Sequence, residues 1–356
     1  MKKIAFFSKN LDFGGIEKVL IDYANYLSSD NEVYFILGTR RGGLLSYLSP
    51  GVGIIELHAE ALKQSLFRLV GVLRKNRFDV VISGSESCNI LLAIANCLIP
   101  KRSKIITSQH SFLNSDTSRF RHEVLLPWAL KRSSLTLCVS EGIRDMLVGQ
   151  KIRPSKLRVL YNPVDRAKIL ENSKKEIKDY GDFLVFVGRI YEVKNIPFLL
   201  KSFKIFLESN PGFKLVLIGD GPERDRSRQF GEELGIGDRL VWVGATSNPY
   251  PYVRQARALV LSSLSESFST VIVEAMCLGK TVVSTPCLGP KEILHAPEYG
   301  YVSKSFDDCV EFAGLMDYAI KHEIPSDKLE EYSKGFDSPV SAGKLGSIID
   351  EVTGRH

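Results

Sequence analysis

Short runs of β-branched and aromatic residues alternate with amphipathic stretches along the whole chain, and this alternation limits the possible folds most strongly. In the first half the runs are almost wholly apolar, at residues 4–8, 32–37, 80–83, 105–108 and 135–139. The stretches between them, such as 17–27 and 62–75, repeat their apolar residues at helical spacing. Strands that are apolar on both faces and are separated by helices indicate a parallel, doubly wound sheet.

The same alternation begins again after a polar stretch at residues 165–182, which we interpret as a linker. Strands are predicted at 183–187, 214–218, 240–243, 259–261 and 281–284, with helices at 197–208, 224–234 and 271–278. A chain of 356 residues is long enough for two cores. We therefore expect an α/β protein with two Rossmann-like domains, residues 1–168 and 169–356, facing a ligand cleft at the carboxyl ends of their strands.

Composition excludes several other classes of protein. The chain is 44% hydrophobic and 25% charged, which are ordinary globular values. No run approaches the roughly 20 apolar residues that a membrane-spanning helix needs. The first apolar run, at residues 4–7, is too short for a secretory signal, so we expect a cytoplasmic protein. The six cysteines lack zinc-ligand spacing and are expected to be reduced.

Positive charge is concentrated in the first half of the chain. Residues 1–165 carry 23 Lys and Arg against 14 Asp and Glu, whereas the whole chain has a net charge of +6. This excess favours an anionic partner such as a nucleic acid, a membrane surface or a phosphorylated lipid. Basic and apolar residues intersperse at 62–77 and again at 112–132, a pattern typical of helices on anionic bilayers and also of ordinary half-buried helices. No nucleic-acid-binding motif is present, so we expect no nucleic acid partner.

Three glycine-containing turns follow predicted strands directly. Gly14 and Gly15 precede a helix, where the backbone can approach an anion closely. Arg189 and Lys194 share the loop after the strand at 183–187, and an Arg fork with a Lys point charge suits a diphosphate. A Gly-Asp-Gly-Pro turn follows at 219–222. Each feature is also compatible with a structural turn or with solvated loop charges, and the chain contains neither G-x-G-x-x-G nor a P-loop pattern.

The segment SESFSTVIVEAM at residues 265–276 places Glu266 before an apolar helix and Glu274 within it. Carboxylates accept paired hydrogen bonds from sugar hydroxyls. The N–H groups of Phe268, Ser269 and Thr270, at the start of the helix, suit phosphate oxygens. A carboxylate on an apolar helix is costly without a partner, and a ligand would supply one. Paired carboxylates also occur in glycosidases, but no barrel pattern supports that alternative.

Together these motifs resemble the large family of retaining GT-B glycosyltransferases called family four, of the bacterial glycan, lipopolysaccharide and capsule type. The resemblance covers nearly the whole chain. Its strongest part is the E-x7-E segment from Glu266 to Glu274 with the following AMCLGKTVVST, supported by VGRIYEVKN, GDGP and the Gly-Gly turn. Ser269 departs from a common glycine, and 288–292 match the family's sugar-proximal glycine turn only in part. The weak pattern after Asp307 leaves open whether the last helix crosses back to the N-terminal domain.

The resemblance implies a role for each of these residues. Glu274 is expected to bind the ribose, Arg189 and Lys194 to neutralise the diphosphate, and Glu266 and His110 to lie near the donor sugar. We expect Glu266, His110, Arg189 and Lys194 to be the catalytic residues. The remaining expected contacts are made by Gly14, Gly15, Phe268, Ser269 and Thr270.

The implied reaction moves a hexose or N-acetylhexosamine from a nucleotide sugar to a glycan acceptor in bacterial surface-polysaccharide assembly. A UDP-sugar donor and a lipid-linked acceptor are favoured, with peripheral contact to an anionic membrane. No D-x-D sequence occurs, so we expect no metal and no cofactor. Two alternatives share the architecture: a UDP-sugar 2-epimerase and a GDP-sugar-dependent transferase.

Overall fold

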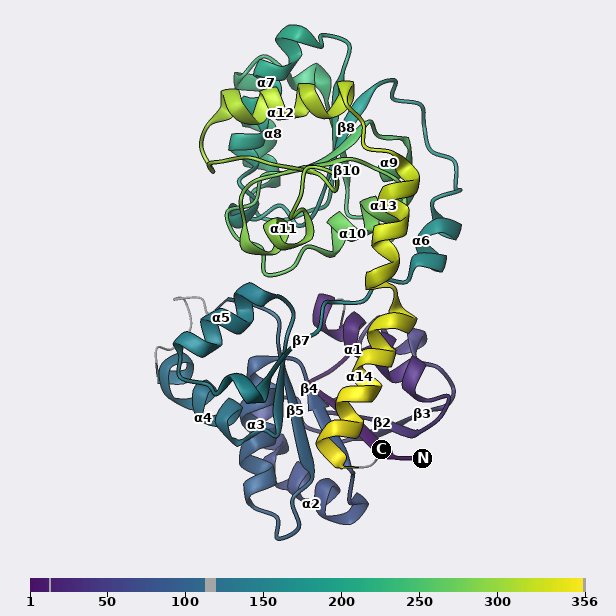
Figure 1. Ribbon diagram of the computed structural model, residues 1–356, viewed down its shortest axis with the longest axis vertical. Coiled ribbons are helices and arrows are strands. Elements are labelled where there is room, and N and C mark those ends of the chain that lie inside the picture. The colour runs from purple at the N-terminus through teal and green to yellow at the C-terminus, as the bar shows by residue number, and fades with distance from the viewer. Residues whose placement is uncertain (13, 113–119, 355–356) are drawn as a thin grey trace. The chain divides into compact units, whose positions relative to one another are not determined.

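The structure is a computed structural model that describes residues 1–12, 14–112 and 120–354. It divides into two compact units, one made of Met1–Pro163 with Ser338–His356 and the other of Val164–Asp337 (Figure 1). The chain therefore passes between the units twice. The expected domain boundary between residues 168 and 169 falls inside helix α6 (Arg166–Asn172), which belongs to the second unit, as does the rest of the polar stretch 165–182.

The first unit contains a seven-stranded parallel sheet with the order β3-β2-β1-β4-β5-β6-β7. Its strands are β1 (Lys3–Ser8), β2 (Glu32–Leu37), β3 (Val52–Glu56), β4 (Val80–Ser83), β5 (Lys104–Gln109), β6 (Leu135–Cys138) and β7 (Leu157–Val159). Its α-helices are α1 (Gly15–Leu27), α2 (Leu66–Asn76), α3 (Glu86–Cys97), α4 (Leu126–Arg132), α5 (Glu141–Gly149) and α14 (Ser338–Thr353).

Strand β1 shows why both faces of this sheet are covered by helices. Ile4 and Phe6 belong to a buried cluster that includes residues of α1 and α14. Ala5 and Phe7, which alternate with them along the strand, belong to a second cluster with residues of α2 and α3. Because successive side chains of a strand point to opposite faces, a wholly apolar strand needs a helical layer on each side.

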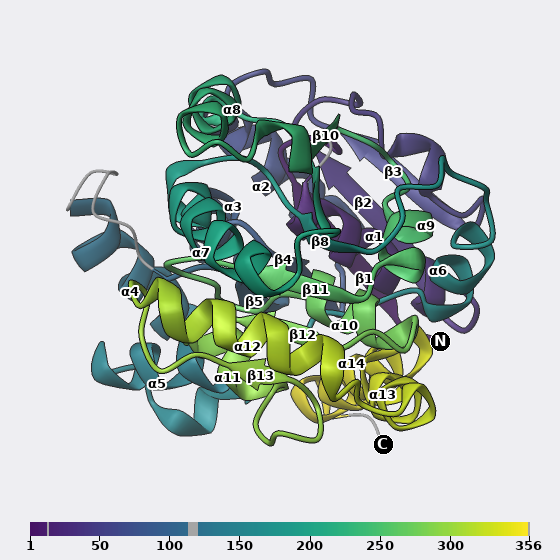
Figure 2. The same cartoon turned by 90° about the horizontal axis from the view of Figure 1, so that it is seen from above.

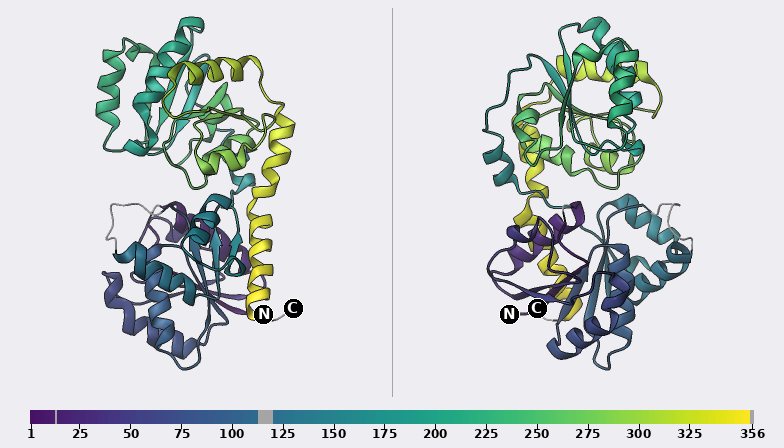
Figure 3. Two further views of the ribbon diagram at one scale, coloured as in Figure 1. Left: turned by 60° about the vertical axis from the view of Figure 1, so that its left-hand side comes forward. Right: turned by 180° about the vertical axis from the view of Figure 1, so that it is seen from behind.

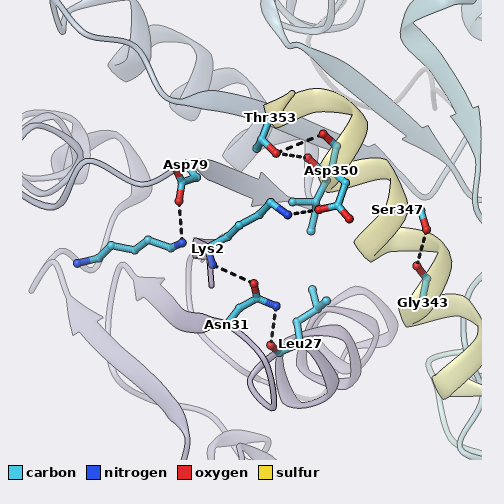
Figure 4. Close-up of polar contacts among 10 residues, drawn as sticks. Lys2, Leu27, Asn31, Asp79, Gly343, Ser347, Asp350 and Thr353 are labelled. Carbon is cyan, nitrogen blue, oxygen red and sulfur yellow. Dashed lines mark hydrogen bonds and ion pairs between the residues drawn. The ribbon is translucent and has the colours of Figure 1, made fainter. Parts of the chain in front are cut away.

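The C-terminal helix α14 is part of the first unit, where it packs beside α1 (Figure 3). Leu345 and Ile349 are fully buried in the cluster shared with α1. The ammonium group of Lys2 pairs with the Asp350 carboxylate, and the Lys2 backbone N–H donates to Asn31 Oδ1 at 3.1 Å (Figure 4). The two ends of the chain are thus tied together by apolar burial and by an ion pair.

The second unit contains a six-stranded parallel sheet with the order β10-β9-β8-β11-β12-β13. Its strands are β8 (Phe183–Val187), β9 (Lys214–Ile218), β10 (Leu240–Gly244), β11 (Ala258–Leu261), β12 (Val282–Ser284) and β13 (Tyr301–Val302). Its helices after α6 are α7 (Ile196–Ser209), α8 (Arg224–Glu233), α9 (Tyr250–Gln255), α10 (Thr270–Cys277), α11 (Leu288–Ile293), α12 (Cys309–Lys321) and α13 (Ser326–Ser333).

Helices α7 and α12 lie side by side in this unit (Figure 2). The rings of Phe198 and Phe312 are 5.2 Å apart. The prediction of two Rossmann-like α/β domains is confirmed. Within the described residues, no helix combines the length and apolar character needed to cross a bilayer.

Candidate functional site

In each sheet the strand order changes direction beside the unit's first strand, between β1 and β4 and between β8 and β11. In open α/β sheets, ligands bind outside the carboxyl ends of the strands at such switch points. The turn at Gly14 and Gly15 follows β1, the loop with Arg189 and Lys194 follows β8, and Glu266 follows β11. The predicted binding loops therefore leave the strands that flank the two switch points.

Lys194 and Glu266 form an ion pair at the switch point of the second sheet. Their side chains are only 20% and 14% exposed, so water screens the two charges weakly. Ser263 Oγ donates a hydrogen bond to the same Glu266 oxygen at 2.8 Å. Ser262 Oγ donates to the Lys194 carbonyl at 2.7 Å, which joins the two loops directly. These contacts hold an ammonium group and a carboxylate side by side at the strand ends.

Close backbone packing supports the loop that carries Arg189. Gly219 adopts a φ of +142°, and a Cβ atom there would lie 1.8 Å from the Gly188 carbonyl oxygen. Only glycine fits such a contact. The Ile190 N–H donates to the Asp220 carbonyl at 2.9 Å on the same turn. The exposed Arg189 side chain makes no ion pair within the described part of the chain, so its charge is available to an anionic ligand.

The acidic segment continues from Glu266 into the start of α10. Phe268 and Ser269 are buried, Ser269 is the N-cap, and Thr270 is the first helical residue. The Ser269 side chain makes no capping hydrogen bond. The Gly289 N–H donates to the Glu266 carbonyl at 3.1 Å. The first turn of a helix has backbone N–H groups without intrahelical partners, and these suit an anion.

Glu274 lies half-buried in the second turn of α10. Burial raises the pKa of the Cys277 thiol to about 11, and the negative charge of Glu274 adds to this rise. Residues 288–292, which match the family's glycine turn only in part, lie in helix α11.

In the first unit the turn after β1 and the end of β5 meet at Gly84. Gly14 is the N-cap of α1 and Gly15 is its first residue. A Cβ atom on Gly84 would lie 2.6 Å from Ile16 Cγ2 in α1 and 3.5 Å from His110 Nε2. His110 Nε2 lies 2.8 Å from Ser108 Oγ. Loss of water around the ring lowers the pKa of His110 to about 4, so the imidazole is neutral at pH 7.

The structure thus brings Lys194, Glu266 and residues 267–270 together in the second unit, and the start of α1 and His110 together in the first. Sequence reasoning missed Ser263 and Gly84. Ser263 follows β11 and Gly84 follows β4, and each of these strands flanks a switch point. Their positions after these strands could have indicated both residues from the sequence. Among the described residues, no three His, Cys, Asp or Glu side chains are grouped closely enough to hold a metal ion.

Two doubly wound units with glycine-rich and charged loops at their switch points define a two-domain protein of the GT-B class. Residues 13–168 match the model of Glycosyltransferase Family 4, and residues 168–336 match that of Glycosyl transferases group 1. The chain belongs to the GT-B glycosyltransferases of family four.

Individual proteins are similar over most of the chain. An N-acetylgalactosamine-N,N'-diacetylbacillosaminyl-diphospho-undecaprenol 4-alpha-N-acetylgalactosaminyltransferase of Campylobacter jejuni is 25% identical, covering 94% of this chain and 93% of the relative. A lipopolysaccharide 1,6-galactosyltransferase of Salmonella typhimurium is 26% identical over 66% of each chain. The structure of Anabaena HepE in complex with UDP superposes with a TM-score of 0.83 at 19% identity, covering 98% of this chain and 100% of HepE.

Proposed function

We propose that the protein is a retaining glycosyltransferase that moves a hexose or N-acetylhexosamine from a UDP-sugar to a lipid-linked glycan acceptor in bacterial surface-polysaccharide assembly. The observation that carries the proposal is the Lys194–Glu266 pair at a switch point, with the Arg189 side chain exposed on the same loop. HepE binds UDP, which supports the nucleotide. The Campylobacter relative acts on a diphospho-undecaprenol-linked glycan, which supports the acceptor.

Donor binding would use the charges that the loops already hold in place. A diphosphate carries more negative charge than one carboxylate, so it competes with Glu266 for Lys194, while Arg189 supplies a planar fork of donors. The N–H groups at the start of α10 add uncharged donors for phosphate oxygens. Glu266, once it shares its cation, can accept hydrogen bonds from the sugar hydroxyls, and Glu274 serves the ribose.

The same cations would act most strongly during transfer. The bond between the sugar C1 and the diphosphate oxygen breaks, a bond from C1 to the acceptor oxygen forms, and the acceptor proton passes to the leaving phosphate on the same face. Negative charge on the phosphate grows as its bond breaks, so Arg189 and Lys194 stabilise the transition state more than the ground state. Because side-chain cations take this role, we expect turnover without a metal ion.

Binding and turnover with UDP-, GDP- and TDP-sugars test this function. We expect UDP-sugars to raise the melting temperature of the purified protein, and the sugar to be transferred with retention when a lipid-linked glycan is added. Arg189→Ala should weaken UDP binding at least tenfold. Arg239→Ala is the matched control, because Arg239 is a half-exposed cation at the opposite, amino end of β10. Conversion of UDP-sugar without acceptor would favour the epimerase, and loss of turnover in EDTA would contradict the metal-free mechanism.

We also propose that helix α2 contacts an anionic membrane. Phe67 is 81% exposed, and the same helix exposes Arg68, Arg74 and Lys75. Residues 61–78 contain five basic residues and no acidic one, so their charge complements anionic headgroups. The other basic segment, 112–132, includes residues 113–119, which lie outside the described part of the chain.

Flotation with vesicles of phosphatidylglycerol and phosphatidylcholine tests this contact. We expect the protein to float with mixed vesicles and not with phosphatidylcholine alone. Phe67→Ser should reduce flotation, whereas Val310→Ser, at another exposed apolar residue in the second unit, should not. Equal flotation of both variants, or no flotation of the unmodified protein, would exclude α2 as the contact.

A further inference from the structure

The loop between Glu266 and α10 rests on an aromatic residue from the end of the second unit. The rings of Phe268 and Phe336 lie 5.9 Å apart, and the two residues are 8% and 6% exposed. Phe336 is the last residue of the 3₁₀ turn η7 (Lys334–Phe336). Asp337, the next residue, is where the chain leaves the second unit.

Phe336 also belongs to a junction between the two chain connections. The Val164 N–H donates to the Phe336 carbonyl at 3.0 Å, and Val164 and Asp337 form a parallel β-bridge. The Arg166 N–H donates to Asp337 Oδ1 at 3.2 Å. The connection that enters the second unit is therefore hydrogen-bonded to the one that leaves it, directly beside the Phe336 side chain.

Phe336 has a second aromatic neighbour, Tyr332. The Tyr332 ring packs on it at 5.5 Å, edge to face. The Tyr332 hydroxyl donates to the Ile293 carbonyl at 3.1 Å, which ties this ring to helix α11. A buried aromatic ring with two ring neighbours has little freedom to move, and close-packed interiors transmit small shifts.

The loop between Glu266 and α10 has little space in which to change its conformation. A Cβ atom on Gly289 would lie 2.8 Å from the Phe268 backbone nitrogen, so Gly289 packs directly against the loop backbone. The Phe268 side chain of this loop is buried, and its ring packs against Phe336. The directions of the N–H groups from Phe268 to Thr270 consequently depend on where that ring is held.

We propose that Phe336 is a positioning residue for the nucleotide sugar. Through the Phe268 ring it fixes the N–H groups at the start of α10, and through its carbonyl it links ligand binding on that loop to the paired connections at Val164 and Asp337. This inference rests on the proposed function, since it takes the loop to be the donor-binding loop. Coupling of this kind is reciprocal: a ligand that orders the loop also stabilises the junction.

Two measurements on the full-length protein test the proposal: UDP affinity by titration calorimetry and amide hydrogen exchange in peptides covering residues 160–168. We expect UDP to slow exchange of the Val164 amide in the unmodified protein. Phe336→Ala should weaken UDP binding at least tenfold and abolish the UDP-dependent slowing. Phe336→Leu, which keeps most of the apolar volume, should restore both in part.

Phe213→Ala is the matched control, because Phe213 is also a buried phenylalanine of the second unit and packs on Phe206 at 5.2 Å. It precedes β9, at the end of the sheet away from the loop. We expect it to lower the melting temperature as Phe336→Ala does, with unchanged UDP affinity. Equal UDP affinity in the unmodified and Phe336→Ala proteins would overturn the positioning role. Absence of UDP binding to the unmodified protein would instead overturn the proposed function on which it rests.

Discussion

Replacement of Lys194 by alanine would remove the charge on which the proposed mechanism depends most. Glu266, with a side chain only 14% exposed, would keep the Ser263 hydrogen bond and lose its cation. Leaving a buried polar group without its partner costs about 1–3 kcal/mol in the free energy of unfolding. Loss of one contact to the leaving group costs about 2.7–4 kcal/mol of barrier, which lowers kcat by roughly 10²–10³-fold.

A second substitution separates these two effects. In Lys194→Ala/Glu266→Gln the unpaired charge is gone, and a neutral amide can still accept the Ser263 hydrogen bond. We therefore expect the double variant to recover most of the lost unfolding free energy, because the uncompensated carboxylate caused the loss. Its kcat should stay at or below that of the single variant, because no cation has returned to the phosphate.

The assays are urea unfolding for stability and UDP release at saturating acceptor for kcat. Glu266→Gln alone provides the remaining corner of the cycle, so the coupling between the two side chains is measured directly. The reasoning would be refuted if Lys194→Ala kept kcat within threefold of the unmodified protein. Recovery of activity together with stability in the double variant would refute it equally, since Lys194 would then be a structural residue only.

Three further predictions concern stability and pH. Leu345→Ala, at a fully buried position of α14, should lower the unfolding free energy by about 2–5 kcal/mol in urea, and a loss below 1 kcal/mol would mean that α14 is not part of the core. Gly219→Ala should lower the melting temperature and weaken UDP binding, because its Cβ would meet the Gly188 carbonyl, whereas Gly212→Ala, with open space around it, should change neither. Burial lowers the pKa of His110 from 6.5 to about 4, so between pH 6.5 and pH 4 the unfolded chain binds more protons than the folded protein. The unfolding free energy should therefore fall as the pH falls from 6.5 to 4. His110→Gln should reduce this pH dependence of the unfolding free energy, and an unchanged dependence would contradict the lowered pKa.

The sequence predicted the central strands of both sheets and missed three of the four edge strands. Strands β2, β4, β8 and β9 have the bounds that their apolar runs predicted. The missed strands are β3, β7 and β13, each at the edge of its sheet. An edge strand has one neighbour and is only partly covered, so its sequence can be short or mixed in polarity. Strand β13, with two residues, carries no readable period at all.

The sequence indicated which residues belong to the candidate site, but it did not indicate which of these residues contact one another. Their positions directly after predicted strands made Arg189, Lys194 and Glu266 candidates for ligand contacts, with solvated loop charges as the alternative, and the family resemblance then implied their roles. The ion pair between Lys194 and Glu266 joins residues 72 positions apart, and it depends on β8 and β11 being neighbours. Strand order is set by the packing of the whole unit, so the sequence of either loop alone does not contain this contact.

The neutral state of the His110 ring bears on the role predicted for this residue. Loops of the second unit present the cations Arg189 and Lys194, which suit a phosphate on which negative charge grows. Sugar transfer passes through an oxocarbenium-like state in which positive charge develops on the ring. A protonated histidine beside that ring would oppose the charge, whereas a neutral imidazole can hydrogen-bond a sugar hydroxyl without opposing it. The lowered pKa keeps His110 neutral at pH 7, and a neutral imidazole is compatible with the predicted role of His110 near the donor sugar.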